Sequence, residues 1–270
     1  NHAFEFNLDW YIAFIDDDVE LDNNCFIRQV EQFNNKSVGM TFSKLHNMEH
    51  QNRFDEAGGF LTNTGFIWSR AGQNDIDVGQ YDKVEEIFAG KSASCMIRKD
   101  VFIEAGGFDD GFGILGEESD LAWRVWLQGY RVLYVPTSTG VHAFNTKFKP
   151  KLKHYNNQRV FFNGCRNYIT MLIKNLGIRR LIQILPIHIC IWFIAGIIMI
   201  LTGAIKEGWN IWKGLWYVVT NLRMILKKRK EIQSNRAVTD DELWPVISRR
   251  PSRGYYFQRF FKYLRTKLHG

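Results

Sequence analysis

The longest uncharged stretch of the chain limits its possible folds more than any other feature. Residues 181–203 read LIQILPIHICIWFIAGIIMILTG and contain no Asp, Glu, Lys or Arg. A helix of this length reaches across a hydrocarbon layer about 30 Å thick. Gln183, Pro186 and His188 interrupt the apolar run. A membrane segment is nevertheless favoured over a helix buried in a soluble core.

The charge of the chain changes sign along its length. Residues 1–143 carry a net charge of −12, whereas residues 144–205 carry +9 and residues 206–270 carry +10. A basic half suits either nucleic acid or an anionic membrane surface. Because the apolar run lies inside this basic half, we expect membrane lipids as partners and no nucleic acid.

Cations on both sides of the apolar run bear on its topology. The positive-inside rule assigns both flanks to the cytoplasm, which a single crossing does not satisfy. Residues 208–226 are rich in Trp and predict an interfacial or returning helix. We therefore expect a basic helical linker over residues 151–180, a hairpin or re-entrant anchor over 181–230 and a basic cytoplasmic tail over 231–270.

The acidic half alternates strand and helix patterns, which predicts an α/β fold. Ser119 and Asp120 are expected to cap a helix, and Pro136 is expected to close the strand after it. The Gly-rich and Asn-rich residues 46–84 predict loops with short strands. The expected strands are 10–15, 37–45, 93–97 and 130–136, and the expected helices are 24–34, 99–105 and 121–128.

Three adjacent carboxylates directly follow the first expected strand. Asp16, Asp17 and Asp18 come after the apolar residues 10–15. Like charges this close raise one another's pKa and repel, so the arrangement is costly unless a cation lies among them. The triplet therefore predicts a metal site.

A second acidic cluster lies about a hundred residues later. Glu117 and Glu118 stand at the start of an expected helix, where acids are often purely structural because they interact favourably with the helix dipole. A carboxylate there is also a candidate general base.

His142 follows the strand after that helix. A lone histidine is more often a packed core residue than a ligand. A site that already offers carboxylates needs further donors, however, and imidazole together with carboxylate suits Mn²⁺, whereas Mg²⁺ prefers oxygen ligands. We therefore count His142 as a metal ligand.

The order of these motifs resembles the family 2 glycosyltransferases of the GT-A fold. The segments that carry the likeness are a strand followed by DDD, then FAGKSASCMIRKDVFIEAGGFDDGF, GEESDLAWRVWLQGYRVLYVP and VHAF. The chain looks similar to rhamnosyltransferases and galactofuranosyltransferases of that family. The resemblance runs from about residue 10 to residue 144 and continues more weakly through Arg166 and Asn167.

The resemblance implies roles for the first cluster and His142. The triplet matches the family's DxD element, in which the last acid, here Asp18, binds a divalent metal that bridges the donor's diphosphate. Asp16 and Asp17 are expected to meet the nucleotide and sugar, with Asp16 also near the metal. His142 matches the histidine that helps to hold the metal. The implied cofactor is Mg²⁺ or Mn²⁺.

The resemblance also implies the catalytic acids. Glu118 matches the general base that removes the proton of the acceptor hydroxyl, although the commonest pattern has Asp at this position. Glu117 precedes it in the same motif, and Asp120 is grouped with the catalytic acids. Arg124 matches an arginine that supports the acceptor loop.

The resemblance implies a fold that is only partly contained in this chain. The family's domain begins with a Rossmann-like half that binds the nucleotide. The chain starts a few residues before its DxD strand, so we expect residues 1–150 to be the C-terminal part of a GT-A domain. The expected fold class is thus α/β with a mixed sheet, followed by a helical membrane-associated region.

The expected activity is an inverting, metal-dependent transfer of a sugar. The donor would be a UDP-, dTDP- or GDP-sugar, and the acceptor a glycan or lipid-linked hydroxyl in cell-surface polysaccharide or glycolipid synthesis, with the catalytic domain on the cytoplasmic face of a membrane. Two alternatives stay open. One is a metal-dependent nucleotidyl or phosphoryl transferase, and the other is an inactive membrane-attached binding or scaffold protein.

Overall fold

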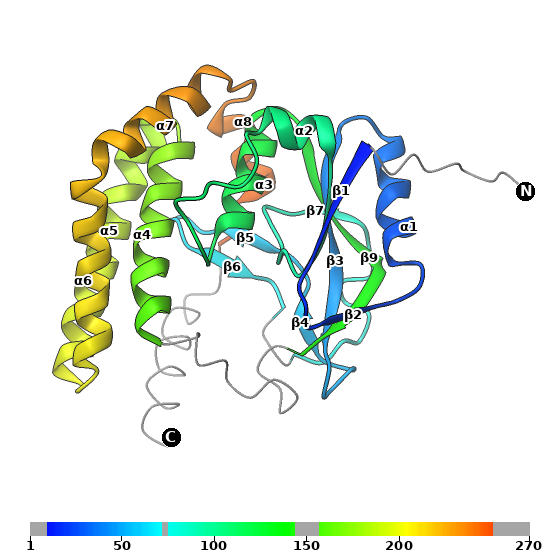
Figure 1. The fold of residues 1–270 in the computed structure, drawn as a ribbon, viewed down its shortest axis with the longest axis horizontal. Helices are drawn as coiled ribbons and strands as arrows, with labels where there is room; N and C mark the ends of the chain where they lie inside the picture. Colours follow the sequence, from blue (N-terminus) through cyan, green and yellow to red (C-terminus); the bar gives the residue numbers. More distant parts are fainter. Residues whose placement is uncertain (1–9, 72–74, 144–156, 251–270) are drawn as a thin grey trace, which may run out of the picture.

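A mixed seven-stranded sheet forms the centre of the N-terminal half (Figure 1). The computed structural model describes residues 10–71, 75–143 and 157–250. The main strand order is β1-β8-β3-β9-β2, with β4 paired to β3 and β7 paired to β9. Only the β3–β9 pairing among these is parallel. The strands are β1 (Tyr11–Ile15), β2 (Val19–Leu21), β3 (Val38–Asn47), β4 (Phe54–Glu56), β7 (Glu85–Glu86), β8 (Ser94–Arg98) and β9 (Arg131–His142).

Helices cover both faces of this sheet (Figure 1). On one face, α1 (Cys25–Val30) and the 3₁₀ helix η2 (Glu31–Asn34) bury Val30 and Phe33 against Met96. On the other face, α2 (Lys99–Glu104) and α3 (Glu117–Leu127) pack in the larger core. Side chains of β8 alternate between the two faces, as strand geometry requires. The predicted α/β fold is confirmed.

In the described part of the chain, five helices follow the sheet. They are α4 (Asn157–Asn175), α5 (Ile178–Leu201), α6 (Ile205–Thr220), α7 (Leu222–Ser234) and α8 (Asp240–Ile247). A small two-stranded sheet, β5 (Gly59–Leu61) with β6 (Ile67–Ser69), lies between them and the main sheet. Buried residues of α4 and α8 belong to the same hydrophobic core as α3 and β3. The helices and the sheet therefore share one core.

Helix α4 falls in the segment that was expected to be a basic linker. It is helical and basic, but its side chains Cys165, Ile169 and Leu172 are almost completely buried in the shared core. The expected tail from residue 231 includes the packed helix α8, and residues 251–270 lie outside the described part of the chain.

Helices α5 and α6 pair closely. The connection between them is Thr202 to Ala204, with Gly203 in the left-handed region at φ 85°. A Cβ added at Gly196 would lie 2.5 Å from Trp212 Nε1, and one at Gly208 would lie 2.6 Å from the Gly196 carbonyl oxygen. Glycine at these positions lets the two backbones approach. Among the described residues, α5 alone is long and apolar enough to cross a membrane, judged by length and composition.

Two expected element boundaries were wrong. Helix α3 begins at Glu117, not Leu121, and its N-cap is Gly116 in the left-handed region at φ 86°. Ser119 and Asp120 therefore lie inside the helix. Strand β9 continues through Pro136 to His142. The register of its pairing with β3 shifts there, from Val135 to Thr139. A proline is tolerated at such an irregularity because its nitrogen carries no hydrogen and cannot donate a hydrogen bond to the neighbouring strand.

Lys174 of α4 lies at the centre of a buried ion-pair cluster. Its ammonium donates to Asp120 Oδ2 of α3 at 2.9 Å and also to Asp109. Lys174 and Asp120 are 1% and 0% exposed. Lys228 of α7 adds a second cation at Asp109. Burial alone would raise the pKa of Asp109, but Lys174 and Lys228 hold it well below its usual value. The cluster joins three helices and the loop before α3.

Replacing Lys174 tests how much this cluster contributes to stability. We expect Lys174→Met to lower the free energy of unfolding by about 3–5 kcal/mol, because it removes the buried cation that Asp109 and Asp120 share and leaves them only Lys228 and Arg124. The matched control is the exposed Lys230→Met on α7, expected to change stability by less than about 0.5 kcal/mol. Urea unfolding at neutral pH measures both. Equal stability of the two variants would contradict the assigned role.

Candidate active site

The acidic triplet lies at the end of strand β1. The last pair of the β1–β8 ladder is Ile15 with Ser94, and the Asp16 amide donates to the Ala93 carbonyl oxygen at 3.3 Å. The chain then turns, with the Val19 amide donating to the Asp16 carbonyl oxygen. This turn leads into β2. The carboxylates thus occupy a tight bend between two strands.

The register of β2 on β9 brings His142 to the triplet. Val19 lies opposite His142, and the Ala143 amide donates to the Asp18 carbonyl oxygen at 2.9 Å. His142 Nε2 lies 3.2 Å from Asp18 Oδ1. One ligand atom from each of Asp16, Asp18 and His142 lies within 4.8 Å of the other two. Asp17 is exposed and lies outside this group.

These three side chains fit a divalent cation. Two carboxylates and an imidazole are a donor set that suits Mn²⁺, and carboxylate oxygens also suit Mg²⁺. His142 is only 4% exposed, so its ring is fixed by its surroundings. A cation would relieve the repulsion between two neighbouring acids. The group is therefore a candidate metal centre.

A buried carboxylate on the other side of the ring orients His142. His142 Nδ1 lies 2.7 Å from Asp55 Oδ2, and Lys91 Nζ donates to the same oxygen at 2.7 Å. Burial raises the pKa of Asp55, but the hydrogen bond with His142 and the charge of Lys91 outweigh it, so the pKa is lowered. An ionised Asp55 accepts a hydrogen bond from Nδ1–H and leaves the Nε2 lone pair toward Asp18.

Sequence reasoning missed both Asp55 and Lys91. Asp55 lies on β4, a strand of three residues within the loops whose pattern could not be interpreted. The adjacent acids Asp55 and Glu56, followed by Ala57 and two glycines, were the only local signal. β4 brings them beside β3, where Glu56 pairs with Leu45.

The loop before α3 positions the second acidic cluster. Asn167 of α4 donates to the carbonyl oxygens of Phe112, Ile114 and Leu115 at 3.1, 2.9 and 2.8 Å. Leu115 has φ 74°, a left-handed conformation that a leucine adopts only when its surroundings enforce it. Helix α4 therefore fixes the backbone that leads into Glu117.

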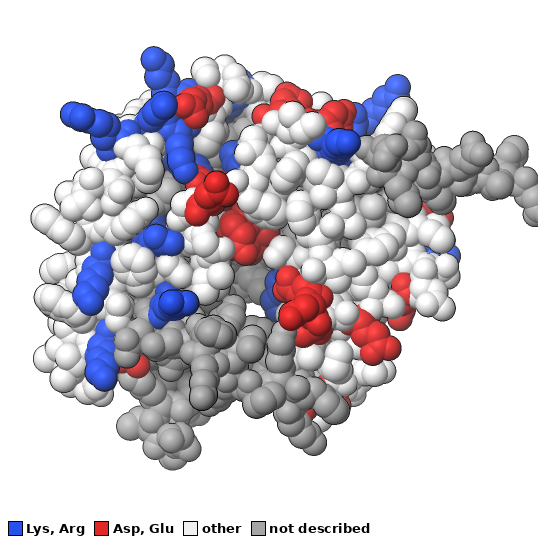
Figure 2. Space-filling view, in the orientation of Figure 1, with Lys and Arg blue, Asp and Glu red and all other residues white. Residues whose placement is uncertain are grey.

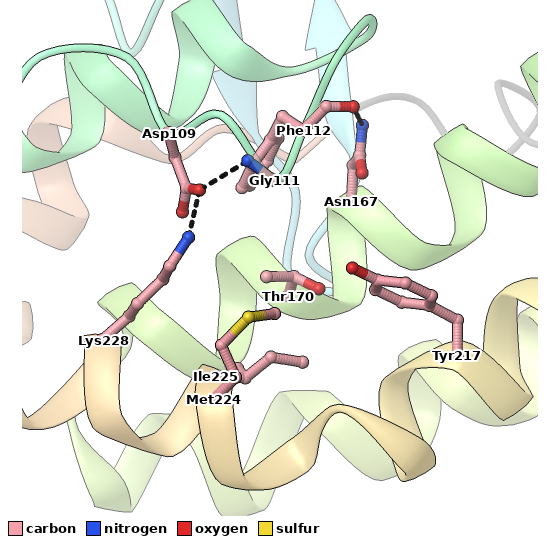
Figure 3. Close-up of a pocket in the computed structure, with 9 residues that line it drawn as sticks. All are labelled: Asp109, Gly111, Phe112, Asn167, Thr170, Tyr217, Met224, Ile225 and Lys228. Atoms are coloured by element: carbon pink, nitrogen blue, oxygen red, sulfur yellow. Dashed lines mark hydrogen bonds and ion pairs between the residues drawn. The ribbon is translucent and has the colours of Figure 1, made fainter.

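A pocket lies behind this loop (Figure 3). Its lining includes Asp109, Phe112 and Asn167, together with Tyr217 and Lys228 from α6 and α7. The Lys228–Asp109 ion pair and the Asn167–Phe112 hydrogen bond cross its edges. Its lining residues thus include those that hold the loop against α4 and α7.

The two glutamates at the start of α3 have raised pKa values. Burial, and then the adjacent Glu117, raise the pKa of Glu118 to about 8. Burial also raises the pKa of Glu117, with a smaller contribution from Asp16. One Glu117 oxygen, Oε2, is buried without a hydrogen-bond partner. Such perturbed acids are characteristic of functional sites.

The two acidic clusters lie near one another. Burial raises the pKa of the Cys95 thiol on β8, and the charges of Glu118 and Asp16 raise it further, so both carboxylates lie within electrostatic range of one thiol. Acidic side chains also border a hollow near the middle of the face in Figure 2. Glu118 and Asp16 therefore both lie near Cys95 of β8.

Asp120 is placed differently from the other predicted acids. Its side chain is 0% exposed, and it accepts hydrogen bonds from Arg124 Nε at 3.0 Å and Asn175 Nδ2 at 2.9 Å in addition to Lys174. Arg124 also donates to the Ala105 carbonyl oxygen. The contacts of Asp120 therefore tie α3 to α4.

Comparison with known sequences identifies a family. The sequence model of the family described as "Glycosyl transferase family group 2" matches residues 11–226. No curated protein matches the chain.

Solved structures give more distant likenesses. One is a crystal structure of GalNAc-T7 with UDP, GalNAc and Mn²⁺, with TM-score 0.43 and 15% identity over 61% of this chain and 31% of that one. Another is the mannosyltransferase PcManGT from Pyrobaculum calidifontis in complex with GDP-Man and Mn²⁺, with TM-score 0.37 and 13% identity over 83% of this chain and 60% of that one. The chain thus spans less than two thirds of either structure.

The family match covers the candidate metal centre, both glutamates and helices α4 to α6. The chain therefore belongs to glycosyl transferase family group 2.

Proposed function

We propose that this protein transfers a sugar from a nucleotide-sugar donor to a hydroxyl group with inversion at the anomeric carbon. The observation that carries the proposal is the grouping of Asp16, Asp18 and His142 within 4.8 Å, with Glu118 and Asp16 both within electrostatic range of Cys95. Family membership supports the reaction class.

Asp16, Asp18 and His142 would hold Mn²⁺ or Mg²⁺ and the donor's diphosphate. A bound ion neutralises the charge that develops on the nucleotide diphosphate as it leaves. Asp55 keeps the His142 ring oriented for this role. Asp17, exposed beside the group, is suited to the sugar or ribose of the donor.

Glu118 would act as the general base. Its carboxylate takes the proton of the acceptor hydroxyl, which attacks the anomeric carbon from the side opposite to the diphosphate. A raised pKa suits this task, because a base works best when its pKa lies near the working pH. One displacement with one base inverts the anomeric centre.

The helical region bears on the acceptor and the location. We propose a glycan or lipid-linked acceptor in the synthesis of cell-surface polysaccharide or glycolipid, with the catalytic half on the cytoplasmic side of a membrane. Helix α5 and the cations around it support this assignment.

A donor screen tests the proposal. UDP-, dTDP- and GDP-sugars, including rhamnosyl and galactofuranosyl donors, are incubated with lipid-linked glycan acceptors and Mn²⁺, and release of nucleoside diphosphate is measured. We expect release only when sugar donor and acceptor are both present, and loss of it in Asp18→Ala. Turnover of nucleoside triphosphates without an acceptor would instead identify a nucleotidyl or phosphoryl transferase.

The Asp55–His142 contact predicts a loss of metal affinity on mutation. We expect Asp55→Asn to weaken Mn²⁺ binding by about 10–100-fold, because the ring loses the carboxylate that fixes its tautomer. The matched control is Asp77→Asn, since Asp77 Oδ2 lies 2.8 Å from His46 Nε2 in a similar contact outside the metal group. Isothermal titration with Mn²⁺ measures both, and equal affinities would refute the role of Asp55.

The raised pKa of Glu118 predicts opposite effects on activity and stability. Activity should rise with pH as Glu118 ionises around pH 8, and Glu118→Gln should abolish turnover but spare Mn²⁺ binding. An ionised, partly buried Glu118 opposes folding increasingly as pH rises from its unfolded pKa toward about 8. Glu118→Gln should therefore melt at a higher temperature than the parent at pH 8, with little difference at pH 5. A lower melting temperature at pH 8 would contradict this.

A further inference from the structure

The outward side of helices α5 and α6 is a continuous apolar surface, which we call the hairpin face. It is defined by six side chains that are each at least 36% exposed: Ile182, Ile189, Phe193, Ile197, Trp209 and Trp216. Their spacing of four or seven residues within each helix places them along one side. The Phe193 ring stacks on Trp212 at 5.8 Å between centroids, so the two helices present one surface.

Cations border this face along α6. Lys206 and Lys213 are exposed and lie three residues before Trp209 and Trp216, respectively. Figure 2 shows basic side chains spaced along the α6 side of the molecule. Lysine stems lie readily on apolar surface while their ammonium groups reach anionic headgroups. Tryptophan is enriched at the same depth of a membrane.

The opposite side of α5 is fixed to the catalytic half. His188, which is 0% exposed, hydrogen-bonds through Nδ1 to the Thr64 carbonyl oxygen at 2.7 Å, and its ring lies 4.1 Å from that of Phe66. Arg180 pairs with Asp241 of α8 at 2.7 Å. The middle of α5 is therefore held by the turn between β5 and β6.

This attachment is incompatible with a crossing by α5. If the helix spanned a bilayer, its middle would lie at the centre, and the β5–β6 turn with the exposed Asn63 would be drawn into hydrocarbon. Beyond the aromatic contact of Trp192 with Phe66, residues 193–201 extend only about 14 Å, less than half of a hydrocarbon layer about 30 Å thick.

We propose that the hairpin face lies flat on one leaflet of an anionic lipid bilayer, with α5 and α6 parallel to the membrane plane. The apolar side chains enter the boundary between headgroups and acyl chains, and Lys206 and Lys213 meet the phosphates. This inference rests on the helices alone and is independent of the proposed sugar transfer.

Cys190 offers a native probe of depth. It is the exposed cysteine among the four, and it lies in the middle of α5. In vesicles that contain phosphatidylglycerol, a fluorophore on Cys190 is quenched by lipids labelled at known depths. The same label is placed on Ile182→Cys and Ile197→Cys in a Cys190→Ser background. We expect all three positions at a similar shallow depth, about 5–10 Å below the headgroups. A crossing helix would make position 190 the deepest, and that profile would overturn the proposal.

Surface variants test the same face by vesicle co-sedimentation. We expect Trp209→Ser/Trp216→Ser to reduce binding at least about tenfold, given the apolar area removed. The control is Trp10→Ser, since Trp10 is 66% exposed, close to the 67% of Trp216, but precedes β1. Lys206→Glu/Lys213→Glu should abolish the preference for phosphatidylglycerol over phosphatidylcholine, whereas Lys99→Glu should not.

Circular dichroism confirms that the variants are folded. If the folded parent does not bind vesicles and instead forms a dimer that the Trp209→Ser/Trp216→Ser variant loses, the hairpin face is a protein interface and the proposal is wrong.

Discussion

The buried pairing of Lys174 with Asp120 and Asp109 is the interaction on which the rest of the structure depends. An ammonium buried in an apolar core is costly unless carboxylates surround it, so α4 packs only where α3 and the loop before it supply those acids. The same contact sets the position of Asn167, which holds the backbone before Glu117. Helix α4 thus contributes both to the core and to the placement of the proposed base.

The proposed metal ligands and the proposed base come from different elements of the fold. The β2–β9 register supplies the metal centre through Asp18 and His142, whereas the start of α3 supplies Glu118. Neither cluster is complete without a residue from elsewhere: Asp55 orients the histidine and Asn167 fixes the loop. The acidic charge is compensated differently in the two places. Near the candidate metal centre, Lys91 forms an ion pair with Asp55. At the two glutamates, the raised pKa of Glu118 favours its neutral form.

Sequence patterns predicted the α/β alternation and the acids near His142, because strand periodicity and clustered charge are local signals. They did not predict Asp55, since its role depends on a three-residue strand pairing with β3. The start of α3 was misplaced because Asp is a residue type that often caps helices. In the structure the Asp120 carboxylate instead accepts hydrogen bonds from Lys174 and Asn175, which are distant in the sequence. Pro136 indicated a strand end, but an irregular β3–β9 register accommodates it.

The shared core also limits where the chain can be truncated. An apolar helix at the end of a catalytic chain is commonly removed to obtain material that stays in solution. Here such a cut after β9 would uncover the inner surfaces of α3 and β5 and would release the loop that Asn167 holds. A shortened protein of this kind would gain exposed apolar surface at the cut and lose the geometry of its active site. Polar substitutions on the outer side of α5 and α6 are the safer route to a soluble form.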